Sequence, residues 1–259
     1  MRTDVLDLEK FYATRLGAVA AIYLARRVAD AWGTCRGETV VGCGYAEPVL
    51  DRMTLEAERL LHLAPAGRGV SARRSEGECL VEEHHWPIAS ASVDKLLIVH
   101  GLEETSGPRR MMREAWRVLK DDGMVILAVA NRTGPWSMVE STPFAAGRPY
   151  TRGQVERLLS ETMFRPTAWS RALCFPPVQS HALVRSAGAW ERAGEKLWPG
   201  LAGVLLVEAQ KSAYAPIGLA QRSPIQAVAE AVTGARAAAP RRVRSPRPQR
   251  PTGRQPLAA

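Results

Sequence analysis

Apolar and polar residues follow two different periods along the chain. Over residues 5–32 apolar side chains recur every three or four positions, as at Leu8, Tyr12 and Val19. This spacing is typical of amphipathic helices and predicts one or two of them before the first strand. Similar patterns predict further helices at residues 48–59, 108–119, 151–159 and 187–197.

Short runs of apolar or β-branched residues alternate with these helices. Runs of this kind are typical of strands that are buried on both faces of a sheet. They predict a strand that ends at Gly42 to Gly44, followed by strands at residues 60–63, 79–81, 93–99, 124–129, 164–174 and 203–211. A charged turn with a glycine, at residues 120–123, is expected to separate the helix at 108–119 from the strand at 124–129.

The alternation of strands and helices predicts an α/β fold with a doubly wound, mostly parallel sheet. We expect one domain over residues 1–215, with N-terminal helices at 5–32, a first half at 38–135 and a second half at 150–211. Residues 216–259 form a low-complexity Arg, Pro and Ala tail, which we expect to be disordered from about residue 235 because it has few apolar anchors.

Charge and cysteine content narrow the class of protein. The formal net charge is +9, but seven arginines after residue 235 supply +7 of it, so only +2 remains for the preceding part. We therefore expect no specific nucleic-acid partner, although the tail can bind polyanions weakly. The four cysteines lie far apart and form no metal-ligand cluster, so we expect reduced thiols and no metal. No apolar run is long enough for a signal peptide or a membrane span, which favours a cytoplasmic protein.

The glycines at the end of the first strand are the strongest candidate for a ligand loop. The segment at residues 38–48 is a β-branched run that breaks at Gly42 and Gly44. Glycine allows positive φ, and it lets a ligand approach the main chain without meeting a Cβ atom. We therefore expect a nucleotide-type ligand at this edge of the sheet, where Gly44→Val would block the ligand with little loss of stability.

Three segments resemble one known family. They are Val40-Val-Gly-Cys-Gly-Tyr-Ala46, the segment from Trp86-Pro to Val99-His100, and Ala115-Trp-Arg-Val-Leu-Lys-Asp-Asp-Gly-Met-Val-Ile-Leu127. Together they resemble the class I S-adenosylmethionine-dependent methyltransferases, in particular the small-molecule type 11 group. The resemblance covers roughly residues 10 to 135. It implies a Rossmann-like sheet of seven strands, with the last strand antiparallel, and a cofactor-binding half at 38–135.

The resemblance also implies a set of cofactor-binding positions. Gly42, Cys43, Gly44 and Ala46 match the turn beneath the methionine and ribose parts of S-adenosylmethionine, and Glu82 matches an acid near the adenine. Val99 and His100 match positions beside the sulfonium. The pair Glu82 and Glu83 is equally compatible with a solvated loop, and His100 with a hydrogen-bonded histidine at a strand end.

One position departs from the family. The acid that holds both ribose hydroxyls at the end of the second strand is replaced by Ala64, and no carboxylate lies between Glu58 and Glu76. Two functions therefore stay open: methyl transfer to a small-molecule acceptor, without an identified catalytic residue, and a catalytically inactive binding or partner protein with the same fold. A dinucleotide-dependent oxidoreductase is disfavoured, because its third motif glycine is replaced by Glu47, which would repel a pyrophosphate.

Overall fold

A seven-stranded sheet forms the centre of the molecule in the computed structural model, which describes residues 3–69, 77–180 and 185–212. The strand order is β3-β2-β1-β4-β5-β7-β6. All neighbouring pairs from β3 to β5 are parallel, whereas β7 is antiparallel to both β5 and β6. The predicted doubly wound, mostly parallel sheet and its antiparallel last strand are confirmed.

The strands follow the apolar runs of the sequence closely. Their bounds are β1 (Thr39–Gly44), β2 (Arg59–Pro65), β3 (Glu78–Val81), β4 (Val93–Val99), β5 (Leu119–Ala130), β6 (Phe164–Ala172) and β7 (Val204–Lys211). Because β1 lies between β2 and β4, its carboxyl end is flanked by both of theirs, as the register Cys43 with Leu63 and Gly44 with Val99 shows. A crevice at the ends of central parallel strands is the usual ligand site of such sheets.

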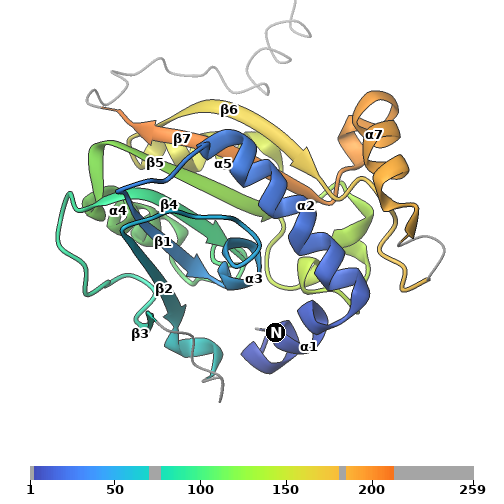
Figure 1. Cartoon of the computed structure of the whole chain (residues 1–259), viewed down its shortest axis with the longest axis horizontal. Coiled ribbons are helices and arrows are strands. Elements are labelled where there is room, and N and C mark those ends of the chain that lie inside the picture. Colours follow the sequence, from blue (N-terminus) through green and yellow to red (C-terminus); the bar gives the residue numbers. More distant parts are fainter. Residues whose placement is uncertain (1–2, 70–76, 181–184, 213–259) are drawn as a thin grey trace, which may run out of the picture. The chain divides into compact units, whose positions relative to one another are not determined.

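Helices cover both faces of the sheet (Figure 1). The helices are α1 (Val5–Ala13), α2 (Arg15–Trp32), α3 (Glu47–Leu50), α4 (Pro108–Val118), α5 (Arg152–Glu161) and α7 (Ala187–Leu197), with 3₁₀ turns η1 (Ala66–Arg68), η2 (Pro135–Met138), η3 (Pro143–Ala145) and η4 (Pro199–Leu201). Successive strand residues point to opposite faces, so Val40 packs with α1 and α2 while Val41 packs with α4 and α5. The continuous apolar runs are explained by this two-sided burial.

The N-terminal region forms two helices, which Thr14 separates. The extended backbone of Thr14 ends α1, and its hydroxyl accepts a hydrogen bond from the Gly17 amide as the N-cap of α2. A side-chain acceptor at this position satisfies an amide that the helix leaves free. The cap therefore turns the chain, so that α1 and α2 are separate elements.

Two predicted boundaries are wrong for identifiable reasons. The helix expected at 48–59 ends at Leu50, because Met53, Leu55 and Ala57 then alternate with exposed polar residues and pack on the core as an extended segment. The turn expected at 120–123 is part of β5. There the register with β4 shifts by a bulge, and the ion pair between Lys120 and Asp94 (2.7 Å) joins the two strands.

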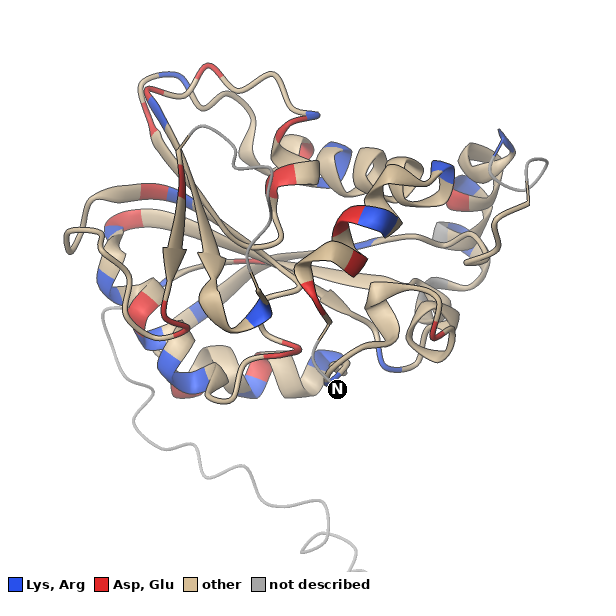
Figure 2. Ribbon diagram, turned by 90° about the horizontal axis from the view of Figure 1, so that it is seen from below, with Lys and Arg blue, Asp and Glu red and all other residues tan. Residues whose placement is uncertain are grey.

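Charged residues are distributed over helices, strands and loops of the described chain (Figure 2). In the same residues, no helix combines the length and the hydropathy that crossing a membrane requires. The tail predicted at residues 216–259 lies outside the described residues.

Candidate functional site

The turn after β1 is held by its own backbone. Gly44 has a φ of 87°, and the amide of the next residue, Tyr45, donates to the carbonyl of Val99 (2.8 Å). A Cβ atom at Gly44 would lie 2.2 Å from the same carbonyl oxygen. The expectation that Gly44→Val clashes with a ligand alone is therefore wrong, because the substitution would first disrupt the contact between β1 and β4.

A small cavity lies beside this turn, at the carboxyl ends of β1 and β2. Its volume is about 30 Å³, and its walls include four of the predicted cofactor positions: Gly42, Gly44, Ala46 and Ala64. Small residues are required here, because a Cβ atom on Gly42 would lie 2.7 Å from Leu50 and 2.9 Å from the Ala46 methyl group. The structure thus brings the glycine motif and the end of β2 to one site.

Acidic side chains from three other elements reach the same cavity. Glu9 of α1, Glu47 of α3 and Glu78 of β3 contribute to its walls. Burial, followed by the charges of these three carboxylates, raises the pKa of Tyr45, which lies between them. These three carboxylates favour a cationic ligand group beside them, although the acid expected at Ala64 is missing.

Ala64 is accompanied by a buried arginine. Arg68 follows β2 on η1, and its side chain is only 7% exposed, with its Nε 3.4 Å from a carboxylate oxygen of Glu104. Arg68 lines the cavity beside Ala64 as well as a second, smaller one near the ends of β3 and β4. We call these two cavities together the groove. Arg68 contributes to the walls of both.

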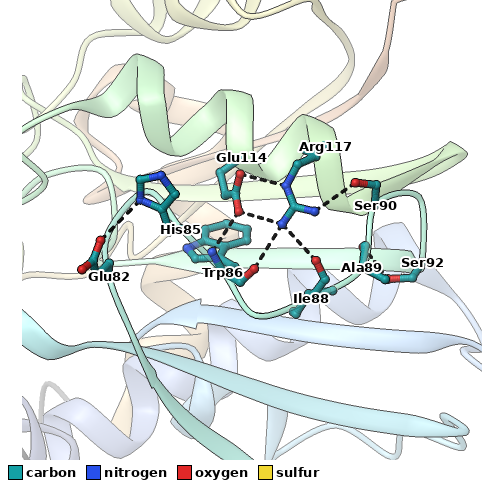
Figure 3. Close-up of polar contacts among 9 residues, drawn as sticks. All are labelled: Glu82, His85, Trp86, Ile88, Ala89, Ser90, Ser92, Glu114 and Arg117. Carbon is teal, nitrogen blue, oxygen red and sulfur yellow. Dashed lines mark hydrogen bonds and ion pairs between the residues drawn. The ribbon is translucent and has the colours of Figure 1, made fainter.

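The structure places Glu82 away from this groove. Its side chain is 82% exposed and forms an ion pair with His85 (3.3 Å), as Figure 3 shows. The adjacent Glu83 points inward instead, where it accepts hydrogen bonds from the Thr105 hydroxyl (2.9 Å) and the Ser106 amide (3.1 Å). The two neighbouring acids therefore face opposite sides of the loop. Glu83 lines the smaller cavity.

The loop between β3 and β4 is anchored to α4. Glu114 accepts a hydrogen bond from the Trp86 amide (2.8 Å), and Arg117 donates to the carbonyls of Trp86 (3.1 Å) and Ile88 (2.9 Å) (Figure 3). Arg117 is oriented in turn by Glu114 at 2.7 Å. This network holds the loop that carries Glu83 at a fixed position above the sheet.

At the end of β4, His100 is buried and neutral. Its Nε2 lies 2.8 Å from the hydroxyl oxygen of Tyr12 of α1, and the ring contacts Phe144 at a centroid distance of 4.8 Å. Burial lowers the pKa of His100 to about 3, so the ring is a very weak base at neutral pH. Two interpretations of His100 were open: a residue beside the sulfonium, or a histidine that forms a hydrogen bond at the strand end. The second one fits this geometry. Its predicted neighbour Val99 is also buried and uses its carbonyl in the β1 contact.

The last predicted position, Cys43, is a buried thiol. Burial raises its pKa to about 12, which makes it unreactive as a nucleophile. It lies on β1 opposite Ile98 of β4 and packs with the α4 side of the core. Cys43 is therefore part of the hydrophobic core next to the glycine turn.

Glu103 is a candidate that sequence reasoning missed. It lies three residues after His100, and one of its carboxylate oxygens accepts a hydrogen bond from the Ala130 amide at the end of β5 (2.7 Å). Its other oxygen is buried without a partner in the described chain. Burial raises the pKa of Glu103 to about 7. A carboxyl group that titrates near neutrality at the end of β4 is a candidate proton acceptor; the pair Glu103-Glu104 directly after a buried strand was the signal in the sequence.

A larger cavity lies on the other side of α1. It has a volume of about 750 Å³ and lies between α1 and the segment around η3, with Phe11, Thr14, Thr142 and Pro143 among its walls. Volumes of 300 to 1,000 Å³ are typical of small-molecule sites. Within the described residues, no three His, Cys, Asp or Glu side chains gather as they would around a metal ion.

The fold is that of S-adenosylmethionine-dependent methyltransferases. The structure is similar to an S-adenosylmethionine-dependent methyltransferase of Thermotoga maritima, described as a possible histamine N-methyltransferase, with a TM-score of 0.54 and 14% identity over 80% of this chain and 96% of the other. It is also similar to SpnF, described as a 4+2 cyclase, with a TM-score of 0.51 and 19% identity over 74% of this chain and 80% of the other. At these identities the likeness concerns the fold alone.

A family model also matches part of the sequence. Residues 28–127 match the type 11 family described as "Methyltransferase domain". This match and the fold confirm the resemblance to the class I S-adenosylmethionine-dependent methyltransferases.

Two relatives are described as uncharacterized proteins. A protein of Mycobacterium tuberculosis is 26% identical over 199 residues, which cover 74% of this chain and 65% of that protein. YafS of Escherichia coli is 30% identical over 147 residues, which cover 55% of this chain and 58% of YafS. The chain thus spans less than two thirds of the length of either relative.

Proposed function

We propose that the protein transfers a methyl group from S-adenosylmethionine to a small-molecule acceptor. The observation that carries this proposal is the cavity at the carboxyl ends of β1 and β2, which is formed by the glycine turn of the matched family segment. When bound, the cofactor supplies an electrophilic methyl group on a positively charged sulfur.

The side chains at the groove fit this cofactor in chemical character. Glu9, Glu47 and Glu78 give the larger part of the groove the negative potential that a sulfonium requires, and they can accept hydrogen bonds from ribose hydroxyls in place of the missing acid. Glu83, rather than Glu82, is the acid that faces the part near the ends of β3 and β4, where the family places the adenine. A volume of about 30 Å³ is too small for the whole cofactor, so side chains of the lining must rearrange when it binds.

The acceptor site of this proposal is the 750 Å³ cavity between α1 and η3. Phe11 and Pro143 provide apolar walls for such an acceptor, and Thr14 and Thr142, whose hydroxyls form hydrogen bonds within the protein, complete this part of the lining. The chain would hold the acceptor in line with the methyl group, since proximity and alignment are the main requirements of this transfer. Glu103, the buried carboxyl group that follows β4, would take up a proton that the acceptor releases.

A catalytically inactive binding protein is the second candidate. Its specific support is Ala64, which the structure places in the wall of the cavity, with Arg68 beside it rather than a carboxylate. Loss of a charge-assisted contact to the ribose weakens binding by about ten- to a hundredfold.

Calorimetric titration separates the two candidates. The wild type is titrated with S-adenosylmethionine and S-adenosylhomocysteine, and the same titrations are made with Ala64→Asp and with the neutral, isosteric control Ala64→Asn. A methyltransferase site predicts binding by the wild type that Ala64→Asp strengthens by about ten- to a hundredfold, while Ala64→Asn has a smaller effect. Absence of binding in all three proteins, with a lower melting temperature for Ala64→Asp, would leave the inactive protein as the better reading.

A further inference from the structure

The guanidinium of Arg68 is buried but only partly paired. Its Nε faces Glu104, whose carboxylate also accepts a hydrogen bond from the Thr3 amide (3.2 Å) ahead of α1. Its Nη1 is buried and has no hydrogen-bond partner in the described part of the chain. Buried donors are nearly always satisfied, so an unsatisfied one beside a cavity indicates a missing acceptor.

Arg68 is directed toward the ends of the central strands. It lines both cavities of the groove, which place it between Ala64 on one side and Gly101 on the other. Burial is the larger influence on the pKa values of Cys43 and His100, and the Arg68 charge is the second, lowering each of them. The positive charge therefore acts on the ends of β1 and β4, where the glycine turn and β4 meet.

A second unpaired nitrogen lies in the wall of the same cavity. His62 of β2 is 7% exposed, and its Nδ1 is buried without a partner among the described residues. This nitrogen can donate a hydrogen bond when it carries the ring proton. Arg68 and His62 together provide two donors that the protein itself does not use.

We propose that Arg68 is an anion-binding residue of the groove, and that it receives a carboxylate or phosphate group carried by an adenosine ligand. The planar guanidinium matches the two oxygens of such a group, and its Nη1 has no acceptor among the described residues. Glu9, Glu47, Glu78 and Glu104 face the same groove, so a ligand with one anionic group is preferred over a polyanion. The charged residue at the end of β2 would thus have the opposite sign to the acid that the family uses there.

This inference rests on the proposed function insofar as the ligand is an adenosine compound. Two sources of the anion are distinguishable with available compounds. S-adenosylhomocysteine carries an amino-acid carboxylate, which 5′-methylthioadenosine lacks, and adenosine 2′-, 3′- and 5′-monophosphates carry a phosphate. Calorimetric titration of the full chain with all five compounds compares the carboxylate and the phosphate directly.

The variants are Arg68→Met, which removes the charge at similar length, and Arg68→Lys, which keeps the charge without the planar fork. Arg165→Met, at an exposed position on β6, is the matched control. For a carboxylate, Arg68→Met should weaken S-adenosylhomocysteine by about ten- to a hundredfold and leave 5′-methylthioadenosine unchanged, with Arg68→Lys between them. If the anion is a phosphate, Arg68→Met should weaken the binding of one of the monophosphates by the same factor.

The outcomes are distinguishable from those of the proposed function. Binding of a monophosphate but not of S-adenosylhomocysteine, with loss in Arg68→Met, would support the anion site and refute the methyltransferase. Equal losses for S-adenosylhomocysteine and 5′-methylthioadenosine, or no loss for any anionic compound, would refute the role of Arg68. If Arg68→Met does not fold, the wild type decides: equal affinities for S-adenosylhomocysteine, 5′-methylthioadenosine and the monophosphates would refute the inference.

Discussion

Glu103 is expected to make the stability of the protein depend on pH. The carboxyl group has a pKa of 4.5 when solvated, and burial raises it to about 7 in the folded chain. Because the folded state binds this proton more tightly, the stabilisation is complete below pH 4.5 and is lost as the pH rises to about 7. The shift corresponds to about 3 kcal/mol, of which about 2 to 3 kcal/mol falls between pH 5 and pH 8.

The substitution Glu103→Gln removes the titrating group but retains an oxygen that can accept from the Ala130 amide. The neighbouring charges act in opposite directions, since Arg68 lowers the pKa of Glu103 and Glu104 raises it, and both remain in the variant. We therefore expect Glu103→Gln to gain about 2 to 3 kcal/mol relative to the wild type between pH 5 and pH 8.

Urea denaturation followed by circular dichroism at several pH values measures this difference. Other titrating groups are common to both proteins, so their contributions cancel. Glu82→Gln, which removes an exposed carboxylate, is the control and should change the free energy of unfolding by less than about 0.5 kcal/mol. A constant difference between wild type and Glu103→Gln from pH 5 to pH 8, or a relative loss of stability in the variant at high pH, would refute the reasoning.

Three further predictions concern the edge of the sheet. Gly44→Val should lower the free energy of unfolding by about 2 kcal/mol or more, because its φ of 87° and the 2.2 Å approach to Val99 exclude a side chain; an unchanged melting temperature contradicts this. Tyr12→Phe should cost about 1 to 3 kcal/mol in urea denaturation, because it leaves the buried His100 Nε2 unpaired, unless water replaces the hydroxyl. Ala64→Asp should tighten S-adenosylhomocysteine more than Ala64→Asn does, and equal calorimetric affinities for the two variants would show that charge is irrelevant there.

The sequence was sufficient to predict the sheet, because the apolar runs that indicate its strands are local patterns. Runs such as residues 96–99 and 124–129 are apolar on both strand faces, and a parallel sheet between two helix layers buries them in that way. The glycine turn was equally accessible, since the change from β-branched residues to Gly42 and Gly44 marks the strand end.

Predictions that needed side-chain direction were less successful. Glu82 and Glu83 are adjacent in the chain, and the choice between them depends on how the loop after β3 leaves the sheet, which the Glu114 and Arg117 contacts determine. The predicted length of α3 was wrong for a related reason. Met53, Leu55 and Ala57 have a period of two, but Leu, Glu and Ala have high helix propensity, and tertiary packing overrides that propensity here.

The groove combines charges that have different consequences for a ligand. Carboxylates from α1, α3 and β3 favour a cation, whereas Arg68, with an unpaired Nη1, favours an anion a few residues from the missing acid. A neutral adenosine uses neither feature, and a polyphosphate is repelled by the carboxylates. A ligand that carries a positive and a negative group at separate positions satisfies both, and the sulfonium and carboxylate of S-adenosylmethionine are such a pair. The substitution of alanine for the ribose acid therefore does not by itself indicate an inactive protein, because the remaining charges still match this cofactor.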